Sequence, residues 1–470
     1  MAKVKSKYVC QICGYETAGY LGKCPECGSW GTFVEETDIP VIKDVQIPDN
    51  CPPMKLNEIE MNSEIRMSTN ISEFDRVLGG GKCIGSAGDS TDIACQGIVQ
   101  GSLVLIAGDP GIGKSTILLQ TSGELCKNDK KVLYVSAEES AGQIKLRAER
   151  LGVKSDNLYI YPQTNLELIK KHIEEMKPDL VIVDSIQAVY TSTIQSSAGS
   201  VSQIRECCNA LMQIAKTQNI SIIVIGHVTK EGNIAGPKVL EHMVDTVIQF
   251  EGDKYKSYRI LRSIKNRFGN TSEVGIFEMG SKGLTEVINP SELFLKEYNQ
   301  TQTPGSTIIV TSEGTRPLLV EIQALVGTTP YPAPRRVANG VDTGRVLQIL
   351  AVLEKRIGLN LSKQDVYVNV IGGIDVNEPA ADLGIALAIV TCVRDVVFDS
   401  HTAIVGEIGL SGEIRAVNHI ERRITEAQKL GFKRIIIPAA NEIQENIEGI
   451  EVIKVKKILE AITRGVRHDN

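Results

Sequence analysis

The chain of 470 residues is predicted to fold as an α/β protein in three parts, and three observations lead to that prediction. Two Cys-x2-Cys pairs lie near the N-terminus. A glycine-rich loop follows a short apolar strand at 103–107 and precedes a helical pattern. Beyond it, apolar strands and helical stretches alternate, which is typical of a mostly parallel sheet with helices on both faces. We expect a small metal-binding module, a nucleotide-binding core and a separate C-terminal α+β domain, because one ordinary core does not extend over this length.

Composition and charge restrict the class of protein. Hydrophobic residues make up 42% of the chain and charged residues 23%, as in ordinary globular proteins. No apolar run reaches the roughly 18 residues that span a bilayer. The basic N-terminus runs into Tyr8 and Cys10 rather than an apolar segment, so we expect no secretory signal and a cytoplasmic location. The net charge of −6 excludes a wholly basic coat for nucleic acid but allows local basic patches.

Four of the eleven cysteines form a metal-binding pattern, with ten residues between two Cys-x2-Cys pairs. Each pair places two thiolates on one tight turn, and two such turns supply the four soft ligands of a tetrahedral structural Zn²⁺. Two disulfides are the alternative, which a cytoplasmic location disfavours. We expect a C4 zinc finger at residues 1–34 and a linker, rich in Pro, Asp, Glu and Ile, at 35–62. The predicted zinc ligands are Cys10, Cys13, Cys24 and Cys27.

The loop after the strand at 103–107 matches the P-loop pattern G-x4-G-K-[ST] between a strand and a helix. Its glycines allow backbone N–H groups to turn toward phosphates. Lys114 is expected to reach the β- and γ-phosphates of ATP, and the Ser115 hydroxyl is expected to bind Mg²⁺. The predicted nucleotide-binding residues of this loop are Gly108, Asp109, Pro110, Gly111, Ile112, Gly113, Lys114, Ser115 and Thr116.

Two further apolar strands end in acidic residues. The strand at 180–183 runs into Asp184, a Walker B pattern in which the carboxylate orients the Mg²⁺ shell. The strand at 131–136 runs into Glu138 and Glu139. One of these can orient and deprotonate the attacking water if its strand neighbours the P-loop strand. We favour Glu138; the alternative is that the two acids only begin a helix near its N-terminal dipole.

Two later strands carry further candidates. The strand at 221–226 ends at His227, which can sense the γ-phosphate, although a purely structural histidine is the alternative. The glycine-rich stretch at 231–238 is expected to be a mobile loop. A further strand delivers Lys265 and Arg267 at a spacing of two, hence on one face. Such cations can stabilise phosphate charge in a neighbouring subunit or hold a DNA backbone, and a solvated basic edge is the alternative.

These residues together resemble the RadA family of bacterial DNA repair proteins, also called Sms, and the resemblance covers nearly the whole chain. The shared features are the cysteine module with Leu-Gly-Lys-Cys-Pro from Leu21, the P-loop, and the Gly-His-Val-Thr-Lys-Glu-Gly run from Gly226. To these is added the Lys-Asn-Arg-Phe-Gly pentapeptide from Lys265, which is close to diagnostic of the family.

The resemblance implies a RecA-like ATPase core, which we place at 63–288. It implies hexameric rings on DNA, similar to those of the replicative DnaB helicases. ATP hydrolysis, binding of single-stranded DNA and branch migration of branched recombination intermediates alongside the RecA recombinase are also implied. By analogy with hexameric helicases, Lys265 and Arg267 are expected to act on the ATP of a neighbouring subunit.

One segment departs from the family pattern. Family members usually run directly from Leu-Gly-Gly-Gly to Ile-Val-Pro-Gly-Ser, whereas residues 82–96 intervene here. This insertion is small, polar and rich in Gly and Ser, so we expect a loop that leaves nucleotide binding intact but can alter a subunit contact. Cys83 and Cys95 within it are expected to be thiols, and Gln100 replaces the usual proline.

The remainder of the chain is predicted to be a linker at 289–304 and a domain at 305–470. This domain resembles the proteolytic domain of Lon protease, which cleaves peptides with a Ser–Lys dyad. Ala380 stands at the position of the serine, and Glu421 stands at the position of the lysine. Neither the nucleophile nor its base remains. Proteolysis is therefore disfavoured, and we expect an oligomerisation platform that can also offer a surface to DNA.

The leading hypothesis is thus a DNA-dependent ATPase motor of recombinational repair, with ATP, Mg²⁺ and Zn²⁺ as cofactors. The alternative is a partner-regulated, non-motor ATPase similar to KaiC. The basic residue pair and the zinc module weakly favour the motor. Stimulation of ATP hydrolysis by DNA separates the two hypotheses.

Overall fold

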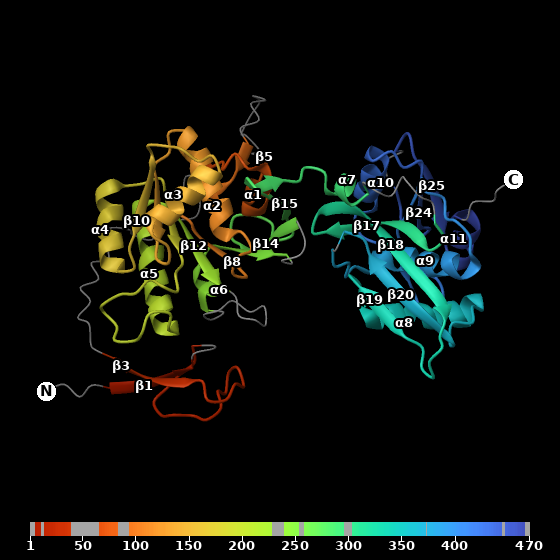
Figure 1. Cartoon of the computed structure of the whole chain (residues 1–470), viewed down its shortest axis with the longest axis horizontal. Coiled ribbons are helices and arrows are strands. Elements are labelled where there is room, and N and C mark those ends of the chain that lie inside the picture. The colour runs from red at the N-terminus through yellow and green to blue at the C-terminus, as the bar shows by residue number, and fades with distance from the viewer. Residues whose placement is uncertain are drawn as a thin grey trace, which may run out of the picture. The chain divides into compact units, whose positions relative to one another are not determined.

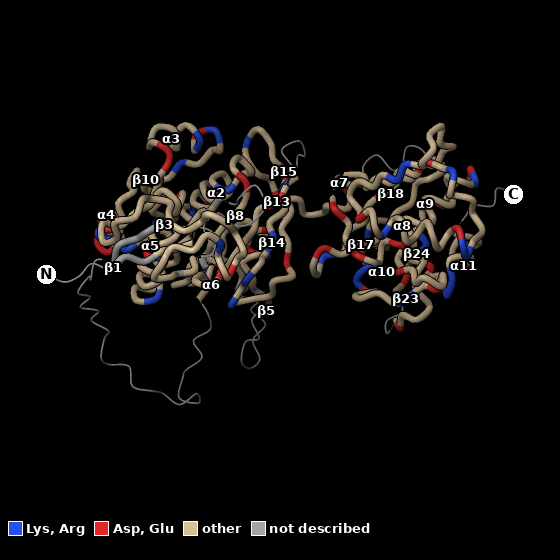
Figure 2. Tube along the Cα trace, turned by 90° about the horizontal axis from the view of Figure 1, so that it is seen from below, with Lys and Arg blue, Asp and Glu red and all other residues tan. Residues whose placement is uncertain are grey.

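The computed structural model describes residues 5–10, 14–38, 65–82, 94–227, 239–252, 258–295, 303–372, 374–443 and 447–465 (Figure 1). The chain divides into two compact units, Met1–Val287 and Ile288–Asn470. Within the described ranges, no helix has the length and apolarity to cross a membrane. Lys and Arg are interspersed with Asp and Glu along both units (Figure 2), in keeping with the absence of a wholly basic coat predicted from the net charge.

The N-terminal module is a three-stranded antiparallel sheet in the order β2–β1–β3. Its strands are β1 (Lys5–Cys10), β2 (Glu16–Thr17) and β3 (Phe33–Asp38). The register runs from Cys10 opposite Phe33 to Lys5 opposite Asp38. Strand β3 therefore continues past residue 34, where we expected a linker to begin. Its acidic composition suggested a linker, but the backbone pairing with β1 determines the structure of this segment.

A nine-stranded sheet forms the ATPase core, in the order β10–β9–β11–β12–β8–β13–β14–β15–β16. Strands from β10 to β13 are parallel, and β14 to β16 continue the sheet as antiparallel strands. The bounds are β8 (Leu103–Gly108), β9 (Val132–Ser136), β10 (Leu158–Pro162), β11 (Leu180–Asp184), β12 (Ser221–His227), β13 (Thr246–Glu251), β14 (Tyr258–Asn266), β15 (Val274–Gly280) and β16 (Gly283–Glu286).

Helices cover both faces of this sheet, as predicted. Successive side chains of a strand point to opposite faces, so each strand contributes to two cores. In β8, Val104 and Ile106 belong to the core of one face, whereas Leu103 and Leu105 belong to the core of the other. The first core includes residues of α1 (Ser72–Leu78), α2 (Lys114–Lys127) and α3 (Ala141–Arg150). The second includes residues of α4 (Leu166–Met176), α5 (Val201–Gln218) and α6 (Val239–Met243).

The inserted segment begins and ends in a hairpin stem, where β5 (Gly80–Lys82) pairs with β6 (Ala94–Gln96). Residues 83–93, with Cys83, lie outside the described part of the chain. Arg66 fixes the base of the stem, because its guanidinium donates to the carbonyls of Gly79 at 2.7 Å and Gly97 at 3.2 Å. The segment was predicted as a loop, and the paired stem was missed because short Gly- and Ser-rich strands carry no apolar alternation. Nearby, β4 (Arg66–Met67) pairs with β7 (Ile98–Val99).

The C-terminal unit is built on a seven-stranded mixed sheet in the order β19–β20–β18–β17–β21–β24–β25. The antiparallel pair β17–β18 comes first in the chain and lies in the middle of the sheet. The strands are β17 (Ser306–Glu313), β18 (Arg316–Thr328), β19 (Arg336–Asn339), β20 (Gln364–Val370), β21 (Thr402–Ile404), β24 (Arg434–Pro438) and β25 (Glu451–Val455), with a small separate pair β22 (Glu407–Ile408) and β23 (Ile414–Arg415). The helices are α7 (Pro290–Phe294), α8 (Thr343–Val352), α9 (Asp382–Arg394), α10 (Ile420–Lys429) and α11 (Ile458–Gly465).

Helix α7 lies inside the stretch at 289–304 that we expected to be a linker. Asn289 caps it by accepting a hydrogen bond from the N–H of Glu292, and Pro290 follows at the first helical position. Leu295 at its end belongs to the core of the C-terminal unit. The Asn-Pro pair is a helix-start signal that the polar composition of the segment obscured.

The adjacent cysteines of α5 provide a test of this core. Cys207 and Cys208 are fully buried, and burial raises the pKa of each thiol to about 12. At pH 8 we expect both to react with iodoacetamide roughly a thousandfold more slowly in the native protein than in urea, because the thiolate is the reacting species. Peptide mass spectrometry over a time course measures both rates. Equal rates in the two conditions would contradict the packing of α5 against the sheet.

Candidate nucleotide site and its surroundings

A cleft of about 450 Å³ lies where the P-loop leaves β8 and enters α2. This volume is within the range typical of small-molecule sites. Gly113 is necessary in the loop, because its φ is +123° and a Cβ there would approach the Met279 side chain to 2.8 Å. The lining residues are Pro110, Gly111, Gly113, Lys114, Ser115, Thr116, Ser136, Glu138, Glu139, Arg147, Arg150, Asp184, Arg259 and Met279.

Lys114 is held inside the loop that precedes it. Its ammonium group donates to the carbonyl oxygens of Gly108 at 2.7 Å and Asp109 at 2.8 Å. Burial lowers the pKa of Lys114, and the nearby carboxylate of Asp184 opposes that shift. A buried cation at the mouth of a glycine loop favours an anionic ligand, since phosphate charge would offset the cost of desolvating the ammonium.

Asp184 and Ser115 meet at one phenol. The hydroxyl of Tyr134 donates to Asp184 Oδ2 at 2.6 Å, and Ser115 also hydrogen-bonds this phenol. Burial, and next the charge of Asp184, raise the pKa of Tyr134 well above its usual value, so the phenol stays protonated as a donor. A carboxylate and a hydroxyl sharing one network are hard oxygen donors of the kind that Mg²⁺ prefers, and the residues present therefore fit that ion.

Glu138 and Glu139 both line the cleft, but they have different partners. The hydroxyl of Ser185, next to Asp184, donates to Glu138, whereas Glu139 accepts a hydrogen bond from Arg147. Our condition that their strand should neighbour the P-loop strand is not met, because β11 and β12 lie between β9 and β8. The two acids reach the cleft because the carboxyl ends of parallel strands share one edge of the sheet.

His227 is the last residue of β12 and lies in register with Gly108 of the neighbouring strand β8. Its backbone is therefore next to the start of the P-loop. The side chain of His227 and the stretch at 231–238 lie outside what the structure describes.

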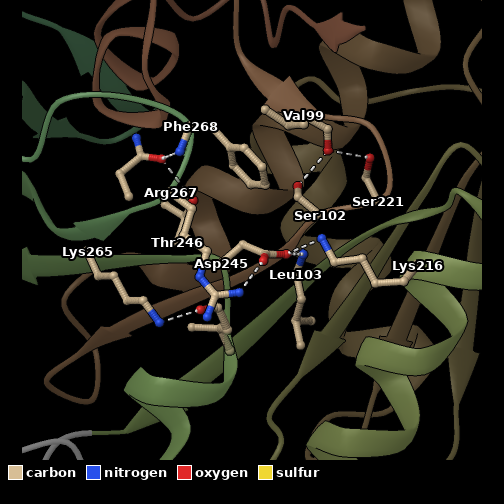
Figure 3. Close-up of polar contacts among 12 residues, drawn as sticks. Val99, Ser102, Leu103, Lys216, Ser221, Asp245, Thr246, Lys265, Arg267 and Phe268 are labelled. Carbon is tan, nitrogen blue, oxygen red and sulfur yellow. Dashed lines mark hydrogen bonds and ion pairs between the residues drawn. The ribbon is translucent and has the colours of Figure 1, made fainter. Parts of the chain in front are cut away.

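Lys265 and Arg267 lie together at one corner of the sheet, and each is engaged within the chain (Figure 3). The Lys265 ammonium donates to the carbonyls of Glu241 at 2.7 Å, His242 at 3.2 Å and Val244 at 2.8 Å, around the C-terminal end of α6. Burial, and next the charge of Arg267, lower the pKa of Lys265. Arg267 donates to Asp245 at 3.1 Å.

This corner is at the opposite end of β8 from the cleft. Thr246 pairs with Val104 on one side and Asn266 on the other, whereas the P-loop begins at Gly108. The four residue steps from Val104 to Gly108 extend roughly 13 Å along the strand. Lys265 and Arg267 are accordingly absent from the described lining of the cleft.

Sequence reasoning missed several residues that the structure brings to these sites. Lys216 of α5 joins Arg267 at Asp245, with an ammonium-to-carboxylate distance of 2.8 Å. Arg147 lines the nucleotide cleft, and the buried Tyr134 hydrogen-bonds Asp184 from behind the cleft wall. The only available signal for Arg147 was its place eight residues after Glu139, two turns into the expected helix. No pattern in the sequence indicated Tyr134 or Lys216.

Three of the four predicted zinc ligands come together in the N-terminal module. The sulfur atoms of Cys10, Cys24 and Cys27 all lie within 4.8 Å of one another, and Cys13 lies outside the described residues. The Cys10 and Cys27 sulfurs are 3.7 Å apart, too far for a disulfide bond. Thiolates on a tetrahedral zinc, at about 2.3 Å from the metal, lie roughly 3.8 Å apart, so the cluster fits Zn²⁺.

The positions that match the Lon dyad are occupied by a different arrangement. Ala380 is buried, and Glu421 lies in the first turn of α10. Close to both in sequence, Glu378 and the buried Arg423 form an ion pair, and Arg423 also donates to the carbonyl of Val310 at 2.7 Å. Arg423 thereby connects α10 to β17 through the carbonyl of Val310, and the ion pair supplies no hydroxyl nucleophile.

The cysteine cluster generates one prediction. We expect the intact protein to bind about one zinc per chain and Cys24→Ser to lose at least about tenfold in zinc affinity, because a structural site needs all four ligands. Metal analysis after dialysis against a competing chelator measures the difference. Cys126→Ser, which changes a buried cysteine of α2, is the control and should keep its zinc. Equal zinc content in the two variants would contradict the predicted ligand set.

Comparison with known proteins agrees with this arrangement. Family models described as an AAA domain, as subunit ChlI of Mg-chelatase and as a rubredoxin metal binding domain match residues 87–233, 343–441 and 8–35, respectively. The ATPase domain of G40P, a solved structure, is 15% identical to this chain with a TM-score of 0.35, and the match covers 40% of this chain and 86% of that domain.

Curated relatives match the whole chain. The DNA repair protein RadA of Bacillus subtilis is 51% identical over 98% of this chain and 99% of its own length. RadA of Listeria monocytogenes is 51% identical over 99% of this chain and 100% of its own length. RadA of Halalkalibacterium halodurans is 50% identical over 98% of this chain and 99% of its own length. The AAA match and the P-loop identify the core as an ATPase domain that binds ATP and Mg²⁺. The N-terminal match and the cysteine cluster identify a zinc site. The chain therefore belongs to the RadA family of DNA repair proteins.

Proposed function

We propose that this protein is a DNA-dependent ATPase of recombinational repair. In this proposal it works in the cytoplasm as a homohexamer, binds single-stranded and branched DNA, and drives branch migration alongside the RecA recombinase. The family of its relatives, which are named for DNA repair, supports the DNA substrate.

The observation that carries the proposal is the position of the basic corner. Lys265 and Arg267 lie at the end of β8 away from their own nucleotide cleft. Any phosphate that they meet therefore belongs to another molecule, either DNA or the ATP of a neighbouring subunit. Arg267 and Lys216 have side chains that are 53% and 47% exposed, so both remain accessible while they contact Asp245. Exposed cations at such a corner suit the backbone of a nucleic acid.

We assign the chemistry of hydrolysis to residues of the cleft. Lys114 would bind the phosphates, and Ser115 and Asp184 would hold Mg²⁺, whose charge would offset that of the phosphate oxygens. Glu138 orients the attacking water and accepts its proton, because the hydrogen bond from Ser185 fixes the carboxylate. We assign a nucleotide-sensing role to His227, whose backbone adjoins the P-loop.

A partner-regulated, non-motor ATPase remains the second candidate, and the contacts of Lys265 favour it. Three carbonyl groups accept hydrogen bonds from this ammonium, which matches its three N–H donors. In the second candidate Lys265 only anchors α6, and DNA has no effect on hydrolysis. The two candidates therefore differ in one measurable quantity.

Glu138→Gln tests the assignment of the general base. We expect kcat for ATP hydrolysis to fall about 100-fold to 10,000-fold, since an amide accepts no proton, while the affinity for ATP stays within about threefold. Steady-state kinetics and nucleotide titration measure these quantities. Glu149→Gln, the same change at an exposed position of α3, is the control. A fall in kcat of less than about fivefold would exclude Glu138 as the base.

Single-stranded DNA tests the motor. We expect it to raise the ATPase rate of the zinc-loaded, assembled protein about tenfold, equivalent to ~1.4 kcal/mol of transition-state stabilisation. Lys265→Ala should abolish the increase, because it removes a cation that meets phosphate, whereas Lys282→Ala, at an exposed turn, should keep it. ATP affinity and Tm of each variant are measured in parallel to detect loosening of α6. Hydrolysis by the unaltered protein that is indifferent to DNA would reject the motor and favour the partner-regulated ATPase.

A further inference from the structure

The nucleotide cleft is lined by three arginines that the P-loop pattern does not include, Arg147, Arg150 and Arg259, and Arg147 of α3 is held there by an acid of the same cleft. Helix α3 begins directly after the two acids that follow β9, with Ser140 as its N-cap. The Ser140 side chain accepts a hydrogen bond from the N–H of Gln143, and the Gln143 side chain accepts one from the N–H of Ser140. This capping box fixes the start of α3 at the edge of the cleft. Because side chains in a helix lean toward its N-terminus, Arg147 reaches back over that edge.

Glu139 holds the Arg147 guanidinium in place. Arg147 Nη2 donates to Glu139 Oε1 at 2.5 Å, and the two side chains are only 24% and 35% exposed. Ser136 in turn fixes the backbone of Glu139, because its hydroxyl donates to the Glu139 carbonyl at 2.7 Å and accepts from the Glu139 N–H at 3.1 Å. The position of the guanidinium is thus determined by two successive contacts before any nucleotide enters.

The contact with Glu139 leaves most of the hydrogen-bonding capacity of Arg147 for a ligand. A guanidinium offers five N–H donors in a planar fork, and the contact with Glu139 uses one of them. The other oxygen of Glu139, Oε2, is buried without a hydrogen-bond partner in the described part of the chain. Two groups at the cleft wall, one cationic and one acceptor, therefore have unused capacity.

Arg147 acts at the metal end of the cleft. Its charge lowers the pKa of Tyr134 against the larger effect of burial, and Tyr134 is the phenol that joins Asp184 to Ser115. Four cations of one chain line the cleft where the terminal phosphate is expected, Lys114, Arg147, Arg150 and Arg259, and of the three arginines Arg147 is the one bound to Glu139. The exposed Arg267 is at the far end of β8 and does not line this cleft.

We propose that Arg147 binds the γ-phosphate of ATP bound in its own chain, with Glu139 as its positioning residue. ADP lacks the γ-phosphate, so the contact makes Arg147 the residue by which the cleft distinguishes ATP from ADP. The proposal rests on the ATP site and not on stimulation by DNA.

Nucleotide affinities measured without DNA test the proposal. We use a β,γ-imido analogue of ATP and ADP, each with Mg²⁺, and titrate the full-length, zinc-loaded protein. Arg147→Ala should lower the affinity for the ATP analogue about 10-fold to 100-fold, as expected for loss of a charge-assisted hydrogen bond. ADP affinity should change by less than about threefold. Lys145→Ala, on an exposed position of the same helix outside the cleft lining, should leave both affinities unchanged.

A second variant covers the case in which Arg147→Ala does not fold. Arg147→Lys keeps the charge but loses the planar fork. It should therefore lower the affinity for the ATP analogue but not for ADP, by a smaller factor than Arg147→Ala does. Retained ADP binding shows that the cleft is intact in either variant. Equal losses for both nucleotides, or no loss for the ATP analogue, would overturn the proposal. Because DNA is absent from this assay, its outcome is independent of whether DNA stimulates hydrolysis.

Discussion

The ATPase core depends on the buried carboxylate of Asp245, whose side chain is 2% exposed. Its two oxygens accept hydrogen bonds from Arg267, from Lys216 and from the backbone N–H of Leu103. A carboxylate at this depth is tolerated only when it is paired. Helix α5, strand β8 and the turn after β14 are therefore held in one arrangement by a single side chain.

This arrangement gives the Lys-Asn-Arg-Phe-Gly pentapeptide a structural meaning within the chain. Lys265 anchors α6, and Asn266 donates to the carbonyl of Leu78 at 2.9 Å. The carbonyl of Phe268 accepts from Arg66, and Gly269 approaches Gly79 so closely that a Cβ would lie 3.1 Å from the Gly79 Cα. The pentapeptide thus connects α6, the buried Asp245 and the base of the inserted hairpin. A contact made at this corner with another molecule would act on all three.

The sequence was sufficient to predict those features whose cause is local. The P-loop and the cysteine turns have fixed spacing, and a short apolar strand before the glycine loop is found as β8. Strand order could not be predicted in this way, because periodicity gives a strand but not its neighbours. Adjacency of β9 and β8 was a condition for the role of Glu138 that the sequence could not test, and two strands separate them. Short elements were obscured by polar composition, as at α7 and the end of β3.

The two acids at the end of β9 show why partners, rather than residue types, separate the remaining hypotheses. Glu138 and Glu139 are chemically alike and adjacent, yet one accepts from Ser185 beside Asp184 and the other from Arg147. The first is placed for water, and the second positions a cation. The core would then have one cation set for its own nucleotide, on α2 and α3, and another for a second molecule, at Asp245. Strand β8 joins the two, because its carboxyl end begins the P-loop and its amino end is bound by Asp245.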